Sequence, residues 1–320
     1  MDRESRERRI RELHLLHVFI TEVCPTLPGT YLDAVAKTWV NDVPTIAMEY
    51  EPLLHSVMAV TILFISTTRR ALPAGPGLGD LRMRRAQYLE STLQEHRKAI
   101  GTINKNNADP AGFTSVILSF DAFASLRERV LEPYEAPTQW LYMSKGVMNV
   151  FKVGRTLVHG NPDAKINIIT ETSASFVDPA VIFRESNRTR FPYLLKESPD
   201  ISLEDMEAYS STLNYLGAIM AARDEGDTMR MVARRIVVFP YMFPDRFVEL
   251  LGAHQPRALI IMAHFFAILS MCSEIWWVGQ TPRREVLGIA RYLGAEWEAL
   301  LAWPLDMINQ NTHSPADHET

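Results

Sequence analysis

One histidine stands alone in a long apolar stretch near the end of the chain. His264 lies in the run 258–272, where almost every other side chain is apolar. Burial in such surroundings lowers the pKa of an imidazole and favours the neutral ring. A neutral ring can hydrogen-bond a hydroxyl or carbonyl group of a ligand, or it can be a core histidine that is tied to a backbone carbonyl. The sequence leaves both interpretations open.

Enzymatic chemistry would have to proceed without a recognisable catalytic signature. The sequence has no Gly-x-Ser-x-Gly elbow, no His-Glu-x-x-His, no Cys-x-x-Cys and no Gly-x-Gly-x-x-Gly loop after a strand. A ring-forming or isomerising reaction needs little beyond a cavity that holds the reactive conformer and one donor to a carbonyl. For a cofactor-independent cyclase, pericyclase or isomerase, the candidate catalytic donors are His264, Tyr142 and Tyr241. We expect no cofactor and no metal site.

The element that carries His264 is predicted to be a buried helix. The run from Ala258 to Cys272 is apolar on nearly all sides of a helix, which is typical of the core of a large helical domain. This run and a second one at 57–66 are shorter than the roughly 20 apolar residues that cross a membrane. We therefore expect no membrane span.

Helical periodicity and capping signals extend along most of the chain. Helices are predicted at 5–24, at 31–39, at 80–104, from Asp109 onward, and from Ser202 onward with Ser202 as the cap. The proline- and glycine-rich run 73–79 predicts a loop. Between 165 and 183 the helical period is lost, and 166–170 predicts a short strand or an extended loop. Residues 313–320 are predicted to be disordered.

Composition argues against several classes of function. The net charge of −5 and the pI near 6.0 disfavour a nucleic-acid-binding domain, which would carry a basic face. Cys24 and Cys272 are far apart in the sequence and are most simply buried apolar residues of a reducing compartment. The charged first residues are unlike a signal peptide, so we expect the nucleus or the cytoplasm and no secretion. The 14 methionines are compatible with a lipophilic pocket, because methionine fills irregular apolar space.

Several motifs occur in a characteristic order along residues 10–305. Near the end of the chain they are the run from His254 to Phe266, then Trp276-Trp277, Arg283-Arg284, Trp297 and Trp303-Pro304. Earlier they are the run from Leu13 to Phe19, Trp39, the runs 43–47 and 50–60, Arg85 to Leu89, and Trp140 to Val147. In this order the chain resembles the fungus-specific transcription factor domain, in the branch of the zinc-cluster regulators that contains the sterol uptake control proteins. The stretch at about 155–205 matches that family poorly.

The resemblance implies an all-α fold and a ligand cavity. We expect one large multi-helix domain at 1–312 and a tail at 313–320. In the sterol sensors that the chain resembles, the ligand lies in a hydrophobic cavity of this domain and nearby loops respond to it, so the apolar loop 240–244 is a candidate gate. The residues expected to contact a ligand are Trp140, Tyr142, Met143, Met220, Tyr241, Met242, Phe243, His264, Phe265, Trp276 and Trp277.

The function that these observations favour is a stand-alone regulatory domain that binds a sterol- or terpenoid-like lipophilic molecule. The binuclear zinc cluster of the resembling regulators needs six closely spaced thiolates, which two cysteines cannot supply. Direct binding of nucleic acid is therefore not expected, and the domain would act through a partner, as a homodimer or as a heteromer with a full-length regulator. Sequestration of the ligand, a gene model that omits an upstream zinc-cluster exon, and the enzyme described above remain as alternatives.

Overall fold

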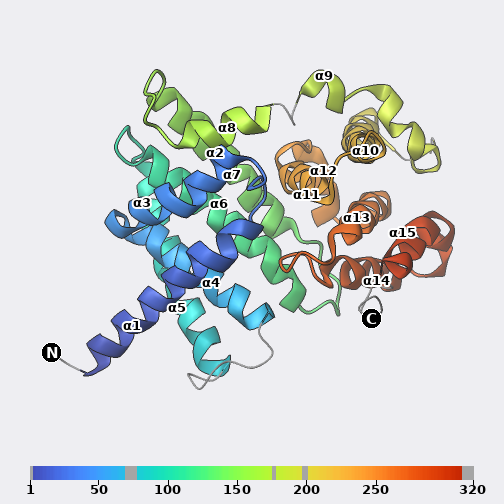
Figure 1. Cartoon of the computed structure of the whole chain (residues 1–320). Coiled ribbons are helices and arrows are strands. Elements are labelled where there is room, and N and C mark those ends of the chain that lie inside the picture. Colours follow the sequence, from blue (N-terminus) through green and yellow to red (C-terminus); the bar gives the residue numbers. More distant parts are fainter. Residues whose placement is uncertain (1–2, 69–77, 175–177, 197–200, 312–320) are drawn as a thin grey trace, which may run out of the picture. The chain divides into compact units, whose positions relative to one another are not determined.

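Helices make up all the regular structure in the described part of the chain. The computed structural model describes residues 3–68, 78–174, 178–196 and 201–311, and within them every regular element is helical (Figure 1). The prediction of an all-α fold is confirmed. The predicted tail 313–320 and most of the predicted loop 73–79 lie outside the described residues, and helix α5 already begins at Leu78.

The helices form two compact units. Unit 1 comprises Met1–Ser125 and Tyr142–Ser175, and unit 2 comprises Leu126–Leu141 and Phe176–Thr320. Helix α7 (Thr138–Leu157) contributes its first turn to unit 2 and its remainder to unit 1.

The core of unit 1 forms around α4 (Glu51–Thr68), whose side chains from Val57 to Ile65 are all buried. Helices α1, α3, α5 and α6 pack against it. The other elements of unit 1 are α1 (Arg3–Val18), η1 (Phe19–Val23), η2 (Cys24–Thr26), α2 (Asp33–Lys37), η3 (Thr38–Asp42), α3 (Val43–Glu49), α5 (Leu78–Gly101), α6 (Ala108–Ala124) and α8 (Ile166–Ala174).

By length and composition alone, α4 could cross a membrane. It has 18 residues with a mean hydropathy of 1.3, and it is longer than the apolar run 57–66 within it. The bent pair formed by Asp245–Gly252 and Pro256–Cys272 passes the same test, although its two parts meet at 107°. Of the α4 window, 67% is buried inside the structure. A core helix has the same composition, so these properties are weak grounds for a membrane span.

The strand or extended loop expected at 166–170 is wrong, because these residues form α8. The carboxylate of Asp109 accepts hydrogen bonds from the backbone N–H groups of Lys165 (2.9 Å) and Ile166 (3.0 Å), and so caps the start of the helix from a distant part of the chain. The side chain of Ile166 is fully buried and packs against two glycines, Gly112 and Gly154. These tertiary contacts override the β propensity of the isoleucine-rich segment.

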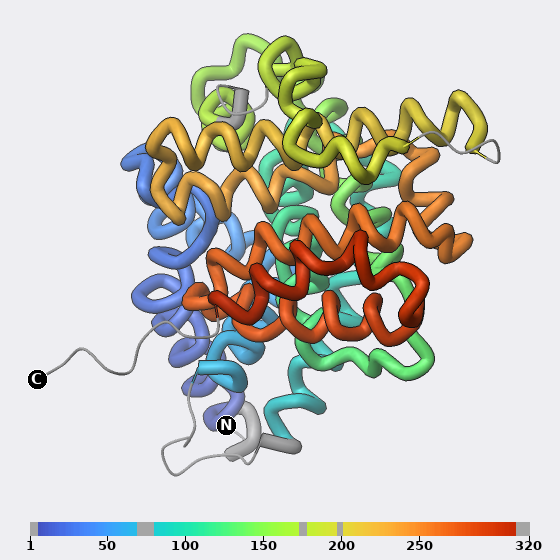
Figure 2. The backbone as a smooth tube through the Cα atoms, turned by 90° about the vertical axis from the view of Figure 1, so that its right-hand side faces the viewer, coloured from blue at the N-terminus to red at the C-terminus, as the bar shows by residue number. Residues whose placement is uncertain are grey.

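The centre of unit 2 is α13 (Pro256–Leu269), which confirms the predicted buried helix. Every side chain from Ala258 to Leu269 is completely shielded from solvent. Helices α10, α12, α14 and α15 pack against α13, and Figure 2 shows α14 and α15 in red beside it. The other elements of unit 2 are η4 (Ser125–Glu128, from Leu126 on), α9 (Pro179–Ile182), η5 (Glu185–Arg190), η6 (Pro192–Leu195), α10 (Leu203–Asp224), α11 (Met229–Val238), η7 (Phe239–Tyr241), α12 (Asp245–Gly252), η8 (Ser270–Cys272), α14 (Thr281–Leu293), η9 (Ala295–Trp297) and α15 (Glu298–Gln310).

The segment 185–195, formed by η5 and η6, lies on α10. Ser202 caps α10 as predicted, because its hydroxyl accepts from the Asp205 N–H at 3.1 Å. Gly217 in the middle of α10 leaves room for the backbone of Asn187 in η5. At the other end of the segment, the Arg257 guanidinium donates to the carbonyl of Leu194 at 2.6 Å. The two attachments fix the segment at both ends.

A buried ion pair ties residues 126–141 to α14. Glu285 is completely buried, and its carboxylate accepts from Nε of Arg129 at 2.6 Å and from the hydroxyl of Tyr134 at 3.0 Å. The Arg129 guanidinium also lies over the Tyr134 ring, 5.2 Å from its centroid. A buried carboxylate needs such partners, because an unpaired charge in the interior is costly.

Cys24 and Cys272 are both buried free thiols, as the sequence predicts. Burial raises the pKa of each thiol to about 12. Neither is therefore a reactive thiolate near neutral pH.

Candidate functional site

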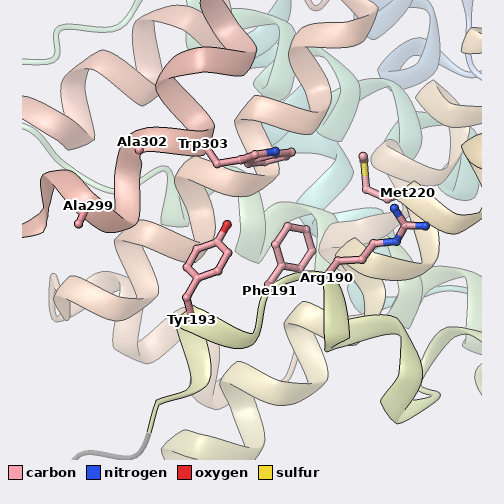
Figure 3. A pocket seen from close by; sticks show the side chains of 7 residues that line it. All are labelled: Arg190, Phe191, Tyr193, Met220, Ala299, Ala302 and Trp303. Atoms are coloured by element: carbon pink, nitrogen blue, oxygen red, sulfur yellow. The ribbon is translucent and has the colours of Figure 1, made fainter.

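A pocket of about 470 Å³ lies in unit 2, bounded by the segment 185–195, α10 and α15. Its lining residues are Arg190, Phe191, Tyr193, Met220, Ala299, Ala302 and Trp303 (Figure 3). Aromatic rings, a methionine and two alanines make most of this surface apolar. Such a lining, with few polar groups, is typical of sites for lipophilic small molecules.

The wall of the pocket is an aromatic cluster built on His264. The ring of Trp303 stacks on His264, with the centroids 5.3 Å apart and the planes 12° from parallel. Phe191 meets both rings edge-on, at 5.6 Å from His264 and 5.8 Å from Trp303. Tyr193 completes the cluster at 5.8 Å from His264. Flat rings in fixed orientations give the wall a defined shape.

His264 lies behind this wall and reaches the pocket through Tyr193. Its Nδ1 atom is 2.8 Å from the carbonyl oxygen of Ile260, and its Nε2 atom is 2.9 Å from the hydroxyl of Tyr193. The structure thus shows the core histidine, tied to a backbone carbonyl through one nitrogen and to a residue of the pocket through the other, and direct contact with a ligand stays a prediction.

Burial keeps both members of this pair uncharged. It lowers the pKa of His264 to about 4 and raises the pKa of Tyr193 to about 12. An efficient general acid or base has a pKa near the working pH. The pair is thus better suited to hydrogen bonding than to proton transfer at neutral pH.

Charged groups lie at the edge of the pocket. The guanidinium of Arg190 donates to the carboxylate of Asp224 at 2.6 Å, and both side chains are about half exposed. Figure 3 shows Arg190 near Met220, at the end of the pocket away from the alanines. The pocket therefore combines an apolar body with a polar edge.

Of the ligand-contacting residues expected from the sequence, Met220 lines the pocket and His264 supports it. Trp140, Phe243 and Phe265 lie instead in an aromatic core around Phe239, which stacks on Phe265 at 4.5 Å and 9°. All three rings are buried, and none is among the residues that line the pocket.

The remaining expected residues are also absent from the lining. Tyr142 is 56% exposed and, with Met143, lies on the part of α7 that belongs to unit 1. Tyr241 and Met242 are partly exposed beside the short turn η7, in the loop that the sequence suggested as a gate. Trp277 is buried and Trp276 is partly exposed, so one ring of this pair packs inward.

Sequence reasoning missed the segment that closes the pocket. Phe191 and Tyr193 belong to the tripeptide Phe-Pro-Tyr, which occurs again at 239–241. The second copy overlaps the apolar loop 240–244, which the sequence suggests as a gate, whereas the first copy lies in the stretch at about 155–205 that matches the family poorly. The repeated tripeptide was the available signal.

Among the described residues there is no group of three or more His, Cys, Asp or Glu side chains arranged to hold a metal ion.

Comparisons with known proteins identify relatives but no family model that matches the chain. The chain is 33% identical over 258 residues to the Zn(2)-C6 fungal-type transcription factor afumD of Aspergillus fumigatus, an alignment that covers 80% of this chain and 66% of that protein. It is 26% identical to a Zn(2)-C6 fungal-type transcription factor of Gibberella zeae, over 93% of this chain and 61% of the relative. It is 22% identical to sterol uptake control protein 2 of Saccharomyces cerevisiae, over 81% of this chain and 27% of the relative. The chain thus spans less than two thirds of each of these relatives.

Proposed function

We propose that this chain is a regulatory region which binds a lipophilic small molecule of sterol or terpenoid type. The proposal proceeds from its homology, over most of its length, to the Zn(2)-C6 fungal transcription factors and the sterol uptake control proteins. The chain is related to the part of these factors that does not bind DNA. Its two cysteines are too few for a Zn(2)-C6 cluster.

The pocket of unit 2 is the observation that carries this proposal. Its volume of about 470 Å³ falls in the range of small-molecule sites. Trp303 presents an aromatic surface, and the thioether of Met220 adapts to irregular shapes. A rigid polycyclic molecule would bury its faces against these side chains and keep its polar end near Tyr193 or Arg190.

The regulatory role would be exerted inside the cell through a DNA-binding protein. The net charge of −5 disfavours direct contact with nucleic acid. We propose a homodimer, or a heteromer with a full-length regulator, as the acting species. Ligand binding would shift this assembly between two states, provided that the ligand has a higher affinity for one of them.

The test uses dehydroergosterol, a fluorescent sterol that accepts excitation energy from tryptophan. Trp303 lines the pocket, so binding should produce saturable energy transfer in the purified chain. Ala302 is exposed on α15 and borders the pocket, so Ala302→Leu should fill part of the space with little effect on the core. We expect a loss of affinity of about five- to 150-fold, as overpacking by about 1–3 kcal/mol implies.

The matched control is Ala86→Leu, an exposed alanine of α5 in unit 1. It should bind the sterol as the unaltered chain does. Absence of saturable transfer, or equal affinity of the Ala302→Leu variant, would rule out this pocket as a sterol site. Mass spectrometry of the recovered sterol distinguishes binding from catalysis, because an enzyme of the cyclase or isomerase type would return a changed compound.

A further inference from the structure

Resting on the proposed function, we infer that the pocket selects a lipophilic alcohol over the corresponding ketone, because Tyr193 presents a hydrogen-bond acceptor to the ligand. The inference names the polar group of the ligand and the residue that recognises it. It follows from the directions of two consecutive hydrogen bonds, one between His264 and Ile260 and one between Tyr193 and His264.

The first bond fixes the tautomer of His264. A backbone carbonyl can only accept, so the Nδ1 atom that lies 2.8 Å from the Ile260 oxygen must carry the proton. The imidazole is neutral at physiological pH, since burial lowers its pKa to about 4. Its Nε2 atom therefore has a free lone pair and no hydrogen.

The second bond fixes the hydroxyl of Tyr193. Because Nε2 can only accept, the Tyr193 O–H must donate across the 2.9 Å contact. The proton is present, since the pKa of Tyr193 is raised to about 12. The hydroxyl has no second hydrogen, so toward any further partner its oxygen can only accept.

That oxygen is the one strong acceptor among the lining side chains. Arg190 and Trp303 carry only donors, Phe191 and the two alanines carry neither, and the sulfur of Met220 is a weak acceptor. Figure 3 shows Tyr193 among the lining side chains, with its hydroxyl directed toward the side of Trp303. A ligand hydroxyl placed there can donate to it, whereas a ketone oxygen would meet lone pairs and leave the tyrosine oxygen without a partner.

The experiment compares two probes that differ only at this group, cholesterol and 5-cholesten-3-one, in competition with dehydroergosterol. The alcohol should bind about three- to tenfold more tightly than the ketone, as expected for one neutral hydrogen bond. Tyr193→Phe should weaken the binding of the alcohol and remove this difference. Tyr292→Phe, at a half-exposed tyrosine of α14 outside the pocket, should retain it.

Three outcomes separate the inference from the proposed function. If both probes bind with equal affinity to the unaltered chain, the inference is overturned and the sterol site stands. If neither probe competes, the inference and the proposed sterol site are both overturned. A preference for the alcohol that survives Tyr193→Phe would assign recognition to another group.

A second measurement tests the tautomer without any ligand. In the nitrogen-15 spectrum of the histidine rings, His264 should show a protonated Nδ1 and a bare Nε2 at neutral pH, and its Nε2 resonance should shift in Tyr193→Phe. A protonated Nε2 would reverse the direction of the Tyr193 bond and overturn the inference.

Discussion

The carbonyl oxygen of Asn187 lies 2.0 Å from the position that a Cβ atom on Gly217 would occupy. Only a residue without a side chain allows the backbone of η5 to lie this close to α10. The contact positions the segment 185–195, from which Phe191 and Tyr193 reach the pocket.

We therefore predict that Gly217→Ala destabilises unit 2 by at least about 2 kcal/mol and weakens sterol binding. Alanine is the better helix former, but the new methyl group would force the backbone of Asn187 away from α10. Urea unfolding and the sterol titration measure the two effects. Gly146→Ala on α7 is the control, since a Cβ there meets nothing within 4 Å, and it should be stabilising by about 0.5–1 kcal/mol. Equal free energies of unfolding for the two variants would contradict the close approach of the Asn187 backbone to Gly217.

The stability of the fold should fall as the pH is lowered from about 6.5 to about 4. Burial lowers the pKa of His96 and of His264 to about 4, below the 6.5 of an exposed histidine. Between these pH values the unfolded chain binds protons that the folded chain does not, so the free energy of unfolding rises with pH in this window. Each histidine should contribute on the order of 3 kcal/mol.

His96 provides the means to isolate one contribution. Its Nε2 atom is 2.8 Å from the Ser115 hydroxyl, a bond that the amide of His96→Gln could replace. Urea unfolding at several pH values should give a smaller slope for this variant between pH 4 and 6.5. An unchanged slope would show that His96 titrates alike in the folded and unfolded chain.

Removing the partner of the buried Glu285 should be costly. We predict that Arg129→Met lowers the free energy of unfolding by about 3–5 kcal/mol, because the carboxylate would stay in the interior without its cation. Arg291→Met removes the ion pair with Glu132, in which both side chains are more than half exposed, and should cost less than about 1 kcal/mol. Chemical denaturation of both variants tests this difference. Similar losses in the free energy of unfolding would show that burial does not determine how much each ion pair stabilises the fold.

Asp109 should determine whether α8 forms. Asp109→Ala removes the acceptor of two backbone N–H groups and should cost about 1–2 kcal/mol, with faster hydrogen exchange confined mainly to α8. Asp178→Ala is the comparison, since this exposed residue caps only the four-residue helix α9 through the Ala180 N–H. Unchanged exchange in α8 would mean that the packing of Ile166 is sufficient by itself.

The helical architecture could be predicted where local signals and burial agree. The apolar run at 258–272 has no polar face, and the structure places its helix in the core of unit 2. Ser202 could be identified as a cap because the bond that it makes spans three residues. Both features depend on neighbours in the sequence.

The parts that could not be predicted depend on residues far apart in the sequence. The residues of α8 favour a strand by their propensity, but they form a helix whose cap, Asp109, lies more than fifty positions earlier. The pocket has the same origin, since Tyr193 and His264 are separated by 71 positions and no periodic pattern relates them. Trp140 and Phe265, whose apolar aromatic type suggests ligand contact, pack against each other in the core.

The path of the chain between its two units determines which segments a chimaeric protein would have to carry together. The unit boundaries fall after residues 125, 141 and 175, so the short piece 126–141 belongs with the carboxy-terminal unit although the next stretch, 142–175, does not. That piece supplies Arg129, Tyr134 and Trp140 to the interior of unit 2. A chimaera that joined the sequence from 176 onward to a first half with no arginine equivalent to Arg129 would carry every lining residue of the pocket and yet leave Glu285 without its cation. A chimaera that keeps all of unit 2 would therefore have to take its sequence from residue 126 to 141 together with residues 176 onward.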